Sequence, residues 1–148
     1  MQDSIKILLV DDDKDVTRII QEALSIYGYE NVTCAGDGEE AVRAYPEVLP
    51  DLVFMDIDMP VMDGYEAARR IRALDPDARI VVITGNTSDI RARRTLEEGL
   101  VRTVLQKPIR LWDLKAIADA HAFDCSASEP FSSSHLSPRE STAFGPLP

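Results

Sequence analysis

The sequence predicts an α/β fold: a doubly wound sheet of five parallel strands with helices on both faces. Five short runs rich in apolar residues recur along the chain, and a segment of helical length follows each of them. Runs that are apolar throughout, such as residues 52–55 and 80–83, indicate strands buried on both faces, as parallel strands are. Repeated strand–helix units favour right-handed crossovers, which place helices on both sides of the sheet.

The five expected strands are short runs in which apolar and β-branched residues dominate. In chain order they cover residues 5–10, 31–35, 52–55, 79–84 and 101–106. Cys34 lies in the second run. Because two cysteines do not make a disulfide framework, we expect Cys34 to be a buried free thiol.

Helices are expected after each strand, with recognisable signals at their ends. In chain order they cover about residues 15–27, 39–44, 65–74, a segment containing residues 90–96, and 111–122. Gly28 and Gly99 follow the first and fourth helices, where a left-handed cap is common. Ser88 or Asp89 can cap the start of the fourth helix. Pro46 predicts that the second helix gives way to an irregular segment before the third strand.

Composition places the chain among soluble globular proteins. Its 148 residues suit one domain, with 45% hydrophobic and 28% charged residues. The net charge of −10 argues against direct binding to nucleic acid, because phosphate contacts need a basic surface. With neither a membrane-length apolar run nor a secretory signal, we expect no membrane insertion and a cytoplasmic location. We expect a folded domain over residues 1–123 and a Ser/Pro-rich flexible tail or linker remnant over 124–148.

Polar residues end four of the expected strands. The first strand ends at Asp11 and Asp12, the third at Asp56, the fourth at Thr84 and the fifth at Lys107. In an open parallel sheet the carboxyl ends of the strands meet at one edge, so these residues can converge. Carboxylates that close repel each other in a poorly solvated pocket, so we expect a cation among them. An all-oxygen cluster favours a hard ion such as Mg²⁺.

Such a site suits phosphoryl transfer, because few protein ligands leave the ion open positions for phosphate oxygens. Asp56 would be the nucleophile, Lys107 a second cation, and the Thr84 hydroxyl a donor to a phosphoryl oxygen. Each residue alone has an ordinary alternative: Asp13 can cap a helix, Thr84 can satisfy a backbone group, and Lys107 can be a loop lysine. Their coincidence at four strand ends favours the site.

These motifs resemble the receiver domains of two-component response regulators, chemotaxis-regulator-like, over residues 4 to about 122. The matching segments are LLVDD at 8–12, DIDMPVMDG at 56–64, VITG at 82–85 and KP at 107–108. The resemblance implies a flavodoxin-like fold with strand order 2-1-3-4-5. It also implies that residues 1–123 form the receiver domain of a phosphorelay. Asp56 would be phosphorylated there by a histidine kinase or a histidine phosphotransfer protein and would switch partner binding.

The resemblance also assigns roles residue by residue. Asp12 and Asp56 would bind Mg²⁺ directly, with Mn²⁺ as an alternative, together with the backbone carbonyl of Asp58, and Asp11 would act through a bound water. Thr84 and Lys107 would contact the phosphoryl oxygens, and the Lys107–Pro108 peptide would be cis. No enzymatic turnover is implied beyond slow autophosphorylation and autodephosphorylation.

The sequence departs from the family pattern at the expected output face. Val104 stands where an aromatic switch residue is usual, and the segment 99–107 is one residue longer than the common pattern. We therefore expect Asp56 to be phosphorylated but the output face to respond differently. A basic set, Arg91, Arg94 and Arg102, is either a solvated face or a surface for an acidic partner or a receiver–receiver dimer.

Two other functions compete with this interpretation. A strand that ends in Asp56-Ile57-Asp58 resembles haloacid-dehalogenase-like phosphatases, which also form an aspartyl phosphate. There, however, the nucleophile ends the first strand, and Thr or Val stands where this chain has Pro60. The other alternative is a receiver-fold interaction module that works without phosphorylation, although such modules usually lose the acceptor, an acidic partner or the lysine.

Overall fold

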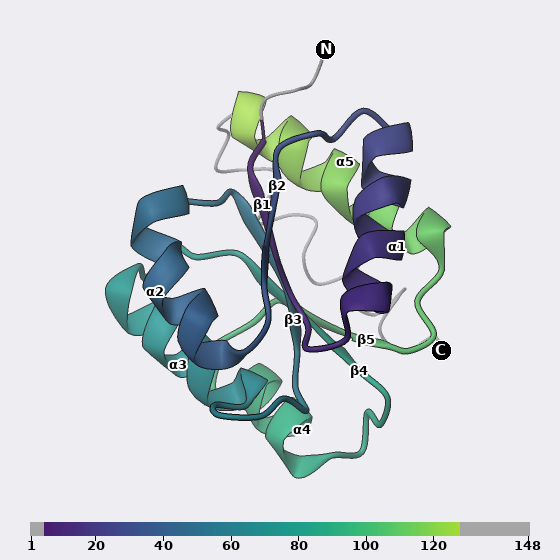
Figure 1. The fold of residues 1–148 in the computed structure, drawn as a ribbon. Coiled ribbons are helices and arrows are strands. Elements are labelled where there is room, and N and C mark those ends of the chain that lie inside the picture. The colour runs from purple at the N-terminus through teal and green to yellow at the C-terminus, as the bar shows by residue number, and fades with distance from the viewer. Residues whose placement is uncertain (1–4, 128–148) are drawn as a thin grey trace.

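The computed structural model of the protein describes residues 5–127, with side chains up to residue 122. Strands and helices alternate along this part of the chain (Figure 1). The strands are β1 (Ile7–Val10), β2 (Val32–Ala35), β3 (Leu52–Asp56), β4 (Ile80–Thr84) and β5 (Thr103–Gln106). The helices are α1 (Lys14–Ile26), α2 (Gly38–Val48), α3 (Gly64–Leu74), α4 (Ile90–Glu97) and α5 (Leu111–Ala127).

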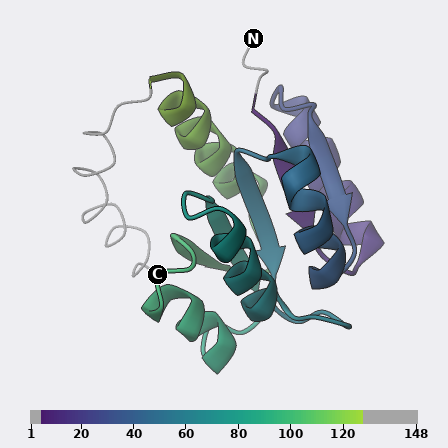
Figure 2. The same ribbon diagram turned by 90° about the vertical axis from the view of Figure 1, so that its left-hand side faces the viewer.

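All neighbouring strands are parallel, and their order is β2-β1-β3-β4-β5. This confirms the predicted doubly wound, flavodoxin-like sheet. Helices α1 and α5 cover one face, and α2, α3 and α4 cover the other (Figures 1 and 2). β1 and β3 are neighbours in the middle of the sheet, with Val10 opposite Met55. The chain therefore leaves both strands at the same edge.

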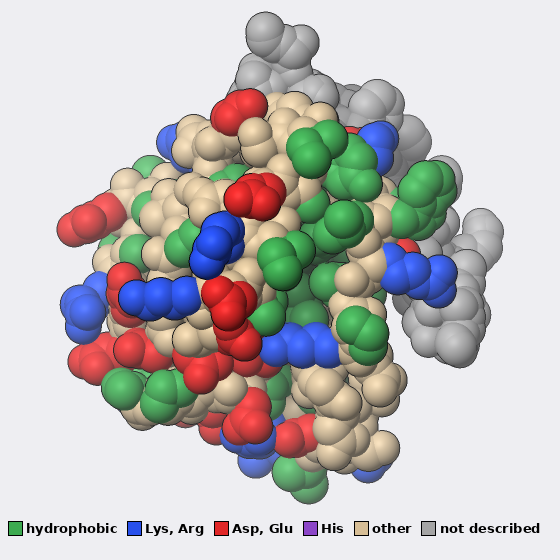
Figure 3. Space-filling model, turned by 45° about the vertical axis from the view of Figure 1, so that its right-hand side comes forward, with side chains coloured by type: hydrophobic (Ala, Val, Ile, Leu, Met, Phe, Trp, Pro, Cys, Tyr) green, Lys and Arg blue, Asp and Glu red, His purple; other side chains and the backbone are tan. Residues whose placement is uncertain are grey.

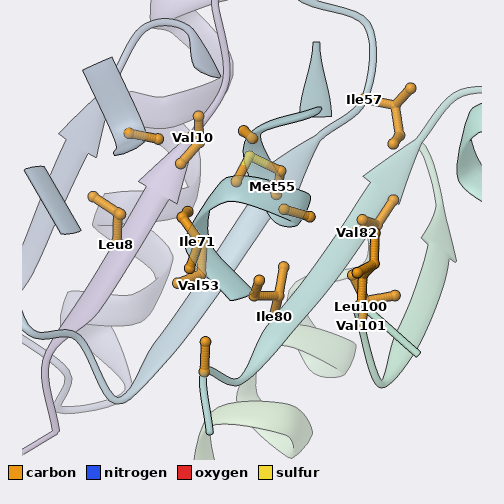
Figure 4. Close-up of a cluster of buried hydrophobic side chains, with 14 of the residues drawn as sticks. Leu8, Val10, Val53, Met55, Ile57, Ile71, Ile80, Val82, Leu100 and Val101 are labelled. Atoms are coloured by element: carbon orange, nitrogen blue, oxygen red, sulfur yellow. The ribbon is translucent and has the colours of Figure 1, made fainter. Parts of the chain in front are cut away.

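Alternating strand residues divide the core into two layers, because successive side chains point to opposite faces of a sheet. Leu8, Val10, Val53, Met55 and Ile80 pack beneath α2, α3 and α4 (Figure 4). The intervening positions of the same strands, together with residues of α1 and α5, form the second layer. Its members are Ile5, Ile7, Leu9, Ile20, Leu24, Tyr29, Leu52, Phe54, Val81, Ile83, Leu114 and Ala118.

Aspartates begin four of the helices. Asp13, Asp37, Asp63 and Asp89 are the N-caps of α1, α2, α3 and α4, and the side chain of each accepts a backbone N–H of the first turn. Of the two predicted caps of α4, the structure thus selects Asp89. Both predicted glycine stops are left-handed, with φ of +99° at Gly28 and +71° at Gly99.

Helix α2 corrects one prediction, because it runs through Pro46 to Val48 instead of ending near residue 44. Pro46 cannot donate a backbone hydrogen bond, yet it stands only in the last part of the helix, where little of the helix follows it. The preceding residue anchors the turn: Tyr45 is buried, and its hydroxyl donates to Asp75 Oδ2 at 2.7 Å. Leu49 then ends the helix in a left-handed conformation, with φ of 51°.

The expectation of a buried thiol at Cys34 was wrong, because this side chain is exposed. It lies on β2, an edge strand that pairs only with β1, and its Sγ is 3.7 Å from Gln21 Oε1. α5 continues to Ala127 instead of ending near residue 122. Most of the predicted tail, residues 128–148, lies outside the described residues. Within residues 5–127 no helix combines the length and the apolarity needed to cross a bilayer.

Candidate functional site

The carboxyl edge of the sheet brings together three aspartates from two neighbouring strands. Asp11 and Asp12 follow β1, Asp56 ends β3, and one carboxylate oxygen from each lies within 4.8 Å of the others. Asp11 and Asp56 are buried, at 6% and 5% exposure, whereas Asp12 is exposed. Acidic side chains are also more numerous in the lower half of Figure 3, the side to which the strands' carboxyl ends point in Figure 1. The cluster therefore opens to solvent on the Asp12 side.

Lys107 lies between the two buried carboxylates. Its Nζ is 3.2 Å from Asp11 Oδ2 and 3.3 Å from Asp56 Oδ1. The end of β5 is held beside the end of β4, because the Lys107 backbone N–H donates to the Thr84 carbonyl oxygen at 2.8 Å. The Lys107–Pro108 peptide is cis, as the family resemblance implied. Three distant segments of the chain thus meet at one small site.

The electrostatics of this site favour a bound cation. The pKa of Asp56 is raised to about 6, mainly because the carboxyl is buried and also because Asp11 is charged, while Lys107 opposes the increase. Burial lowers the pKa of Lys107, but the two carboxylates outweigh this effect and raise it overall. One ammonium therefore faces two buried acids and an exposed one. A divalent ion with oxygen ligands fits this set of donors.

Thr84 is near the cluster, but its hydroxyl is engaged locally. It ends β4, next to β3, and is 4% exposed. Its Oγ1 accepts the Asn86 backbone N–H at 3.1 Å and lies 3.3 Å from the Asn86 carbonyl oxygen. This is the ordinary backbone role considered for it above. A Cβ at Gly85 would meet nothing within 4 Å, so the space beside the Thr84 position is open.

The loop after Asp56 is fixed by a glycine. The Gly64 N–H donates to the Ile57 carbonyl oxygen at 2.9 Å, and a Cβ at Gly64 would lie 2.1 Å from the Asp56 carbonyl oxygen. Only glycine allows the start of α3 to approach the end of β3 so closely. This contact holds the backbone of Asp56 and of the next residues, including Asp58. The Asp58 side chain itself points to solvent and is 87% exposed.

Arg91, one of the three arginines of the predicted basic surface, lies in α4 at this edge of the sheet. Its guanidinium lies 2.7 Å from Asp89, 3.5 Å from Asp63 and 3.6 Å from Asp58. The sequence shows acids at all three positions, but only the fold brings residues 58 and 63 to the start of α4. The sequence alone therefore does not reveal this cluster.

The other two arginines of that predicted surface have different partners. Arg94 pairs with Glu98 at 2.9 Å and stacks over the Tyr65 ring, 4.9 Å from its centroid. Arg102 precedes β5, where its N–H donates to the Ile80 carbonyl oxygen, at the edge opposite to the acidic site. Arg91 and Arg94 thus lie about one turn apart on α4, whereas Arg102 precedes β5, and the role of these arginines in partner binding stays a prediction. Val104, at the position of the usual aromatic, is half-buried and packs against the core layer under α2, α3 and α4.

Comparison with known sequences identifies one family. A family model described as the response regulator receiver domain matches residues 7–119. The chain is 38% identical over 113 residues to the transcriptional regulatory protein PrrA of Mycobacterium tuberculosis, covering 76% of this chain and 48% of that protein. It is 40% identical over 105 residues to the chemotaxis protein CheY of Thermotoga maritima, covering 71% and 87%. The chain spans about half the length of the PrrA proteins it matches.

Solved structures give the same result. The response regulator protein TrrA from Thermotoga maritima, in complex with Mg(2+)-BeF, has a TM-score of 0.70 and 31% identity, covering 79% of this chain and 98% of that one. The N-terminal domain of an uncharacterized protein from Wolinella succinogenes has a TM-score of 0.78 and 31% identity, covering 85% and 100%. Both likenesses extend over most of the described residues.

Proposed function

The chain belongs to the response regulator receiver domain family, and from this premise we propose that it accepts a phosphoryl group on Asp56 in a magnesium-dependent reaction. The observation that carries the proposal is the convergence of Asp11, Asp12 and Asp56 within 4.8 Å, with the Lys107 ammonium on the two buried carboxylates. The complex of TrrA with Mg(2+)-BeF supports an ion at this position in the family.

The donor set fits a hard divalent ion. The side chains of Asp11, Asp12 and Asp56 and the backbone carbonyl of Asp58 would hold Mg²⁺, which supplies positive charge opposite the phosphoryl oxygens. All four groups offer oxygen, and Asp12 is exposed, so the site has room for water and phosphoryl oxygens. With two buried acids and one lysine, the protein alone leaves negative charge that an ion would offset.

In the proposed reaction, an Asp56 carboxylate oxygen forms a bond to the phosphorus of a phosphohistidine, and the phosphorus–nitrogen bond breaks as the imidazole departs. The donor would be a histidine kinase or a histidine phosphotransfer protein. Lys107, 3.3 Å from Asp56 Oδ1, is placed to turn its ammonium to a phosphoryl oxygen. The Thr84 hydroxyl would give up its contacts with the Asn86 backbone to do the same. Gly85 leaves open space for this approach.

The protein would therefore act as an acceptor and a switch, with slow autophosphorylation and autodephosphorylation, and not as an enzyme with a separate substrate. The haloacid-dehalogenase-like alternative loses its support, because Asp56 ends β3 instead of the first strand and the family match is to receivers. The alternative of a phosphorylation-independent module makes a different experimental prediction.

The decisive experiment is incubation with acetyl phosphate and Mg²⁺, followed by intact mass measurement. We expect one phosphoryl adduct on the wild type, none on Asp56→Asn, and none when EDTA removes the metal. Asp77→Asn, at an exposed aspartate outside the site, should behave like the wild type. Absence of an adduct on the wild type, or its persistence in Asp56→Asn, would refute the assignment, and the former result would favour the phosphorylation-independent module.

A further inference from the structure

Arg91 makes the densest set of ionic contacts near the proposed site. It lies in the first turn of α4, and two of its nitrogens donate to the Asp89 carboxylate: Nη2 to Oδ2 at 2.7 Å and Nε to Oδ1 at 3.1 Å. Such two-point contacts between guanidinium and carboxylate are strong and fix the direction of the side chain. The remaining reach of the guanidinium is toward the loop after β3, where Asp63 lies 3.5 Å away and Asp58 3.6 Å away.

Two of these three acids also cap helices, and the third does not. Asp89 and Asp63 are helix caps whose side chains accept backbone N–H groups, from Arg91 at 2.8 Å and from Glu66 at 2.9 Å. They are 21% and 29% exposed, whereas Asp58 is 87% exposed, and within residues 5–127 its side chain forms no hydrogen bond or ion pair besides the one with Arg91. Arg91 is thus anchored by the two caps and restrains Asp58, not the reverse.

The position of Asp58 makes this restraint matter. Asp58 is two residues from the acceptor, and its backbone carbonyl belongs to the proposed metal site. A carboxylate released at this position could turn toward the three acids already gathered there. It would then add a fourth negative charge or a further oxygen ligand, and an oxygen site binds a divalent cation more tightly as its ligand charge rises. The ion pair with Arg91 instead holds the Asp58 carboxylate on the side of α4.

We propose that Arg91 is a positioning residue that holds the Asp58 carboxylate away from the metal site and so weakens Mg²⁺ binding in the unphosphorylated protein. This inference rests on the proposed function, because it concerns the same ion. It also links the loop after β3 to α4 directly. If the Asp58 carboxylate turns to the metal, Arg91 loses one of its three acidic partners in the first turn of that helix.

The test is a double-mutant cycle read by Mg²⁺ affinity, measured by isothermal titration calorimetry on the unphosphorylated full chain. We expect Arg91→Ala to bind Mg²⁺ about three- to tenfold more tightly than the wild type, within the usual range of coupling between neighbouring groups. In an Asp58→Asn background the same substitution should change the affinity less than about twofold. Arg94→Ala, the matched control on the same helix, should leave the affinity unchanged in both backgrounds.

Several outcomes would overturn the proposal. An unchanged or lower affinity in Arg91→Ala would show that Arg91 does not restrain a competing ligand. An increase that persists in full with Asp58→Asn would assign the effect to the lost positive charge alone. Arg91→Gln, which keeps a long polar side chain, should show the same gain if Arg91→Ala fails to fold. A protein that binds Mg²⁺ normally but forms no adduct would refute the proposed function while leaving the Arg91 result to be judged by itself.

Discussion

Strand β3 contains two opposite environments two residues apart. Phe54 is 0% exposed and packs in the apolar layer under α1 and α5. Asp56 is almost as deeply buried, at 5% exposure, but its neighbours are a carboxylate and an ammonium. Burial stabilises the first side chain and destabilises the charge of the second. The difference shows that apolar packing in the middle of the strands stabilises the fold. This stability offsets the unfavourable burial of several charges at the strand ends.

The largest expected effect comes from the apolar half of this comparison. Phe54→Ala removes a fully buried ring and leaves a cavity, so we expect a loss of about 3–5 kcal/mol in the free energy of unfolding. Urea unfolding followed by circular dichroism measures it. Phe54→Leu, which keeps most of the apolar volume, should cost less than about 1.5 kcal/mol. Equal losses in the two variants would mean that packing in this layer does not decide stability.

A second variant tests the backbone beneath the acidic end. The Cβ of Gly64→Ala would lie 2.1 Å from the Asp56 carbonyl oxygen, so the end of β3 must move. We expect a loss of about 3 kcal/mol, the upper part of the usual range for overpacking, and slower phosphorylation by acetyl phosphate. Gly85→Ala has open space and should change stability by less than about 0.5 kcal/mol. A tolerated Gly64→Ala would show that the close approach is not needed.

The charged half of the comparison should appear in the pH dependence. In the metal-free protein the pKa of Asp56 is raised from 3.8 to about 6, so between these values the folded state binds more protons than the unfolded state. The contribution of Asp56 to stability is therefore lost as pH rises through this window, by on the order of 3 kcal/mol. Asp56→Asn stays uncharged and should be more stable than the wild type above pH 6 by this amount.

The difference in stability between the wild type and Asp56→Asn should vanish at low pH and become smaller when Mg²⁺ is bound. Well below pH 3.8 the wild-type carboxyl is protonated in both states, so the two proteins should unfold alike. Saturating Mg²⁺ should stabilise the wild type above pH 6 and reduce the advantage of Asp56→Asn, because the ion binds the folded site. Thermal unfolding at pH 3, 6 and 8, with and without Mg²⁺, measures both effects. A wild type more stable than Asp56→Asn at pH 8 without metal would contradict the raised pKa.

The sequence was sufficient to predict the strands and the residues at their ends, because both depend on local patterns. Apolar runs mark the buried strands, and the parallel arrangement brings Asp11, Asp56 and Lys107 to one edge without further information. The same local chemistry narrowed the cap of α4 to Ser88 or Asp89, and the structure shows Asp89. These features need only the period of the pattern and the direction of the chain.

The features that sequence analysis missed depend on contacts between distant segments. Helix α2 passes Pro46 with Tyr45 bonded to Asp75, a partner beyond the end of α3. Arg91 meets acids of the loop after β3 only because that loop and the start of α4 share the carboxyl edge of the sheet. Cys34 is exposed because β2 is an edge strand; the predicted strand order already implied this edge position, but the apolar run around Cys34 favoured burial.

The smallest expected effect concerns backbone strain in the loop between β3 and α3. Val61 has φ of 69°, which a β-branched residue rarely adopts, and its side chain is 73% exposed and so has little packing to lose. Val61→Asn should therefore stabilise the protein by about 1 kcal/mol, because asparagine tolerates this conformation better. Val61→Gly should gain less, since glycine also loosens the unfolded chain. Ile90→Asn, also at an exposed residue but with ordinary helical backbone, should show no gain. If Val61→Asn is neutral in urea unfolding, the unfavourable energy at this edge of the sheet resides in the charges alone and not in the backbone that carries them.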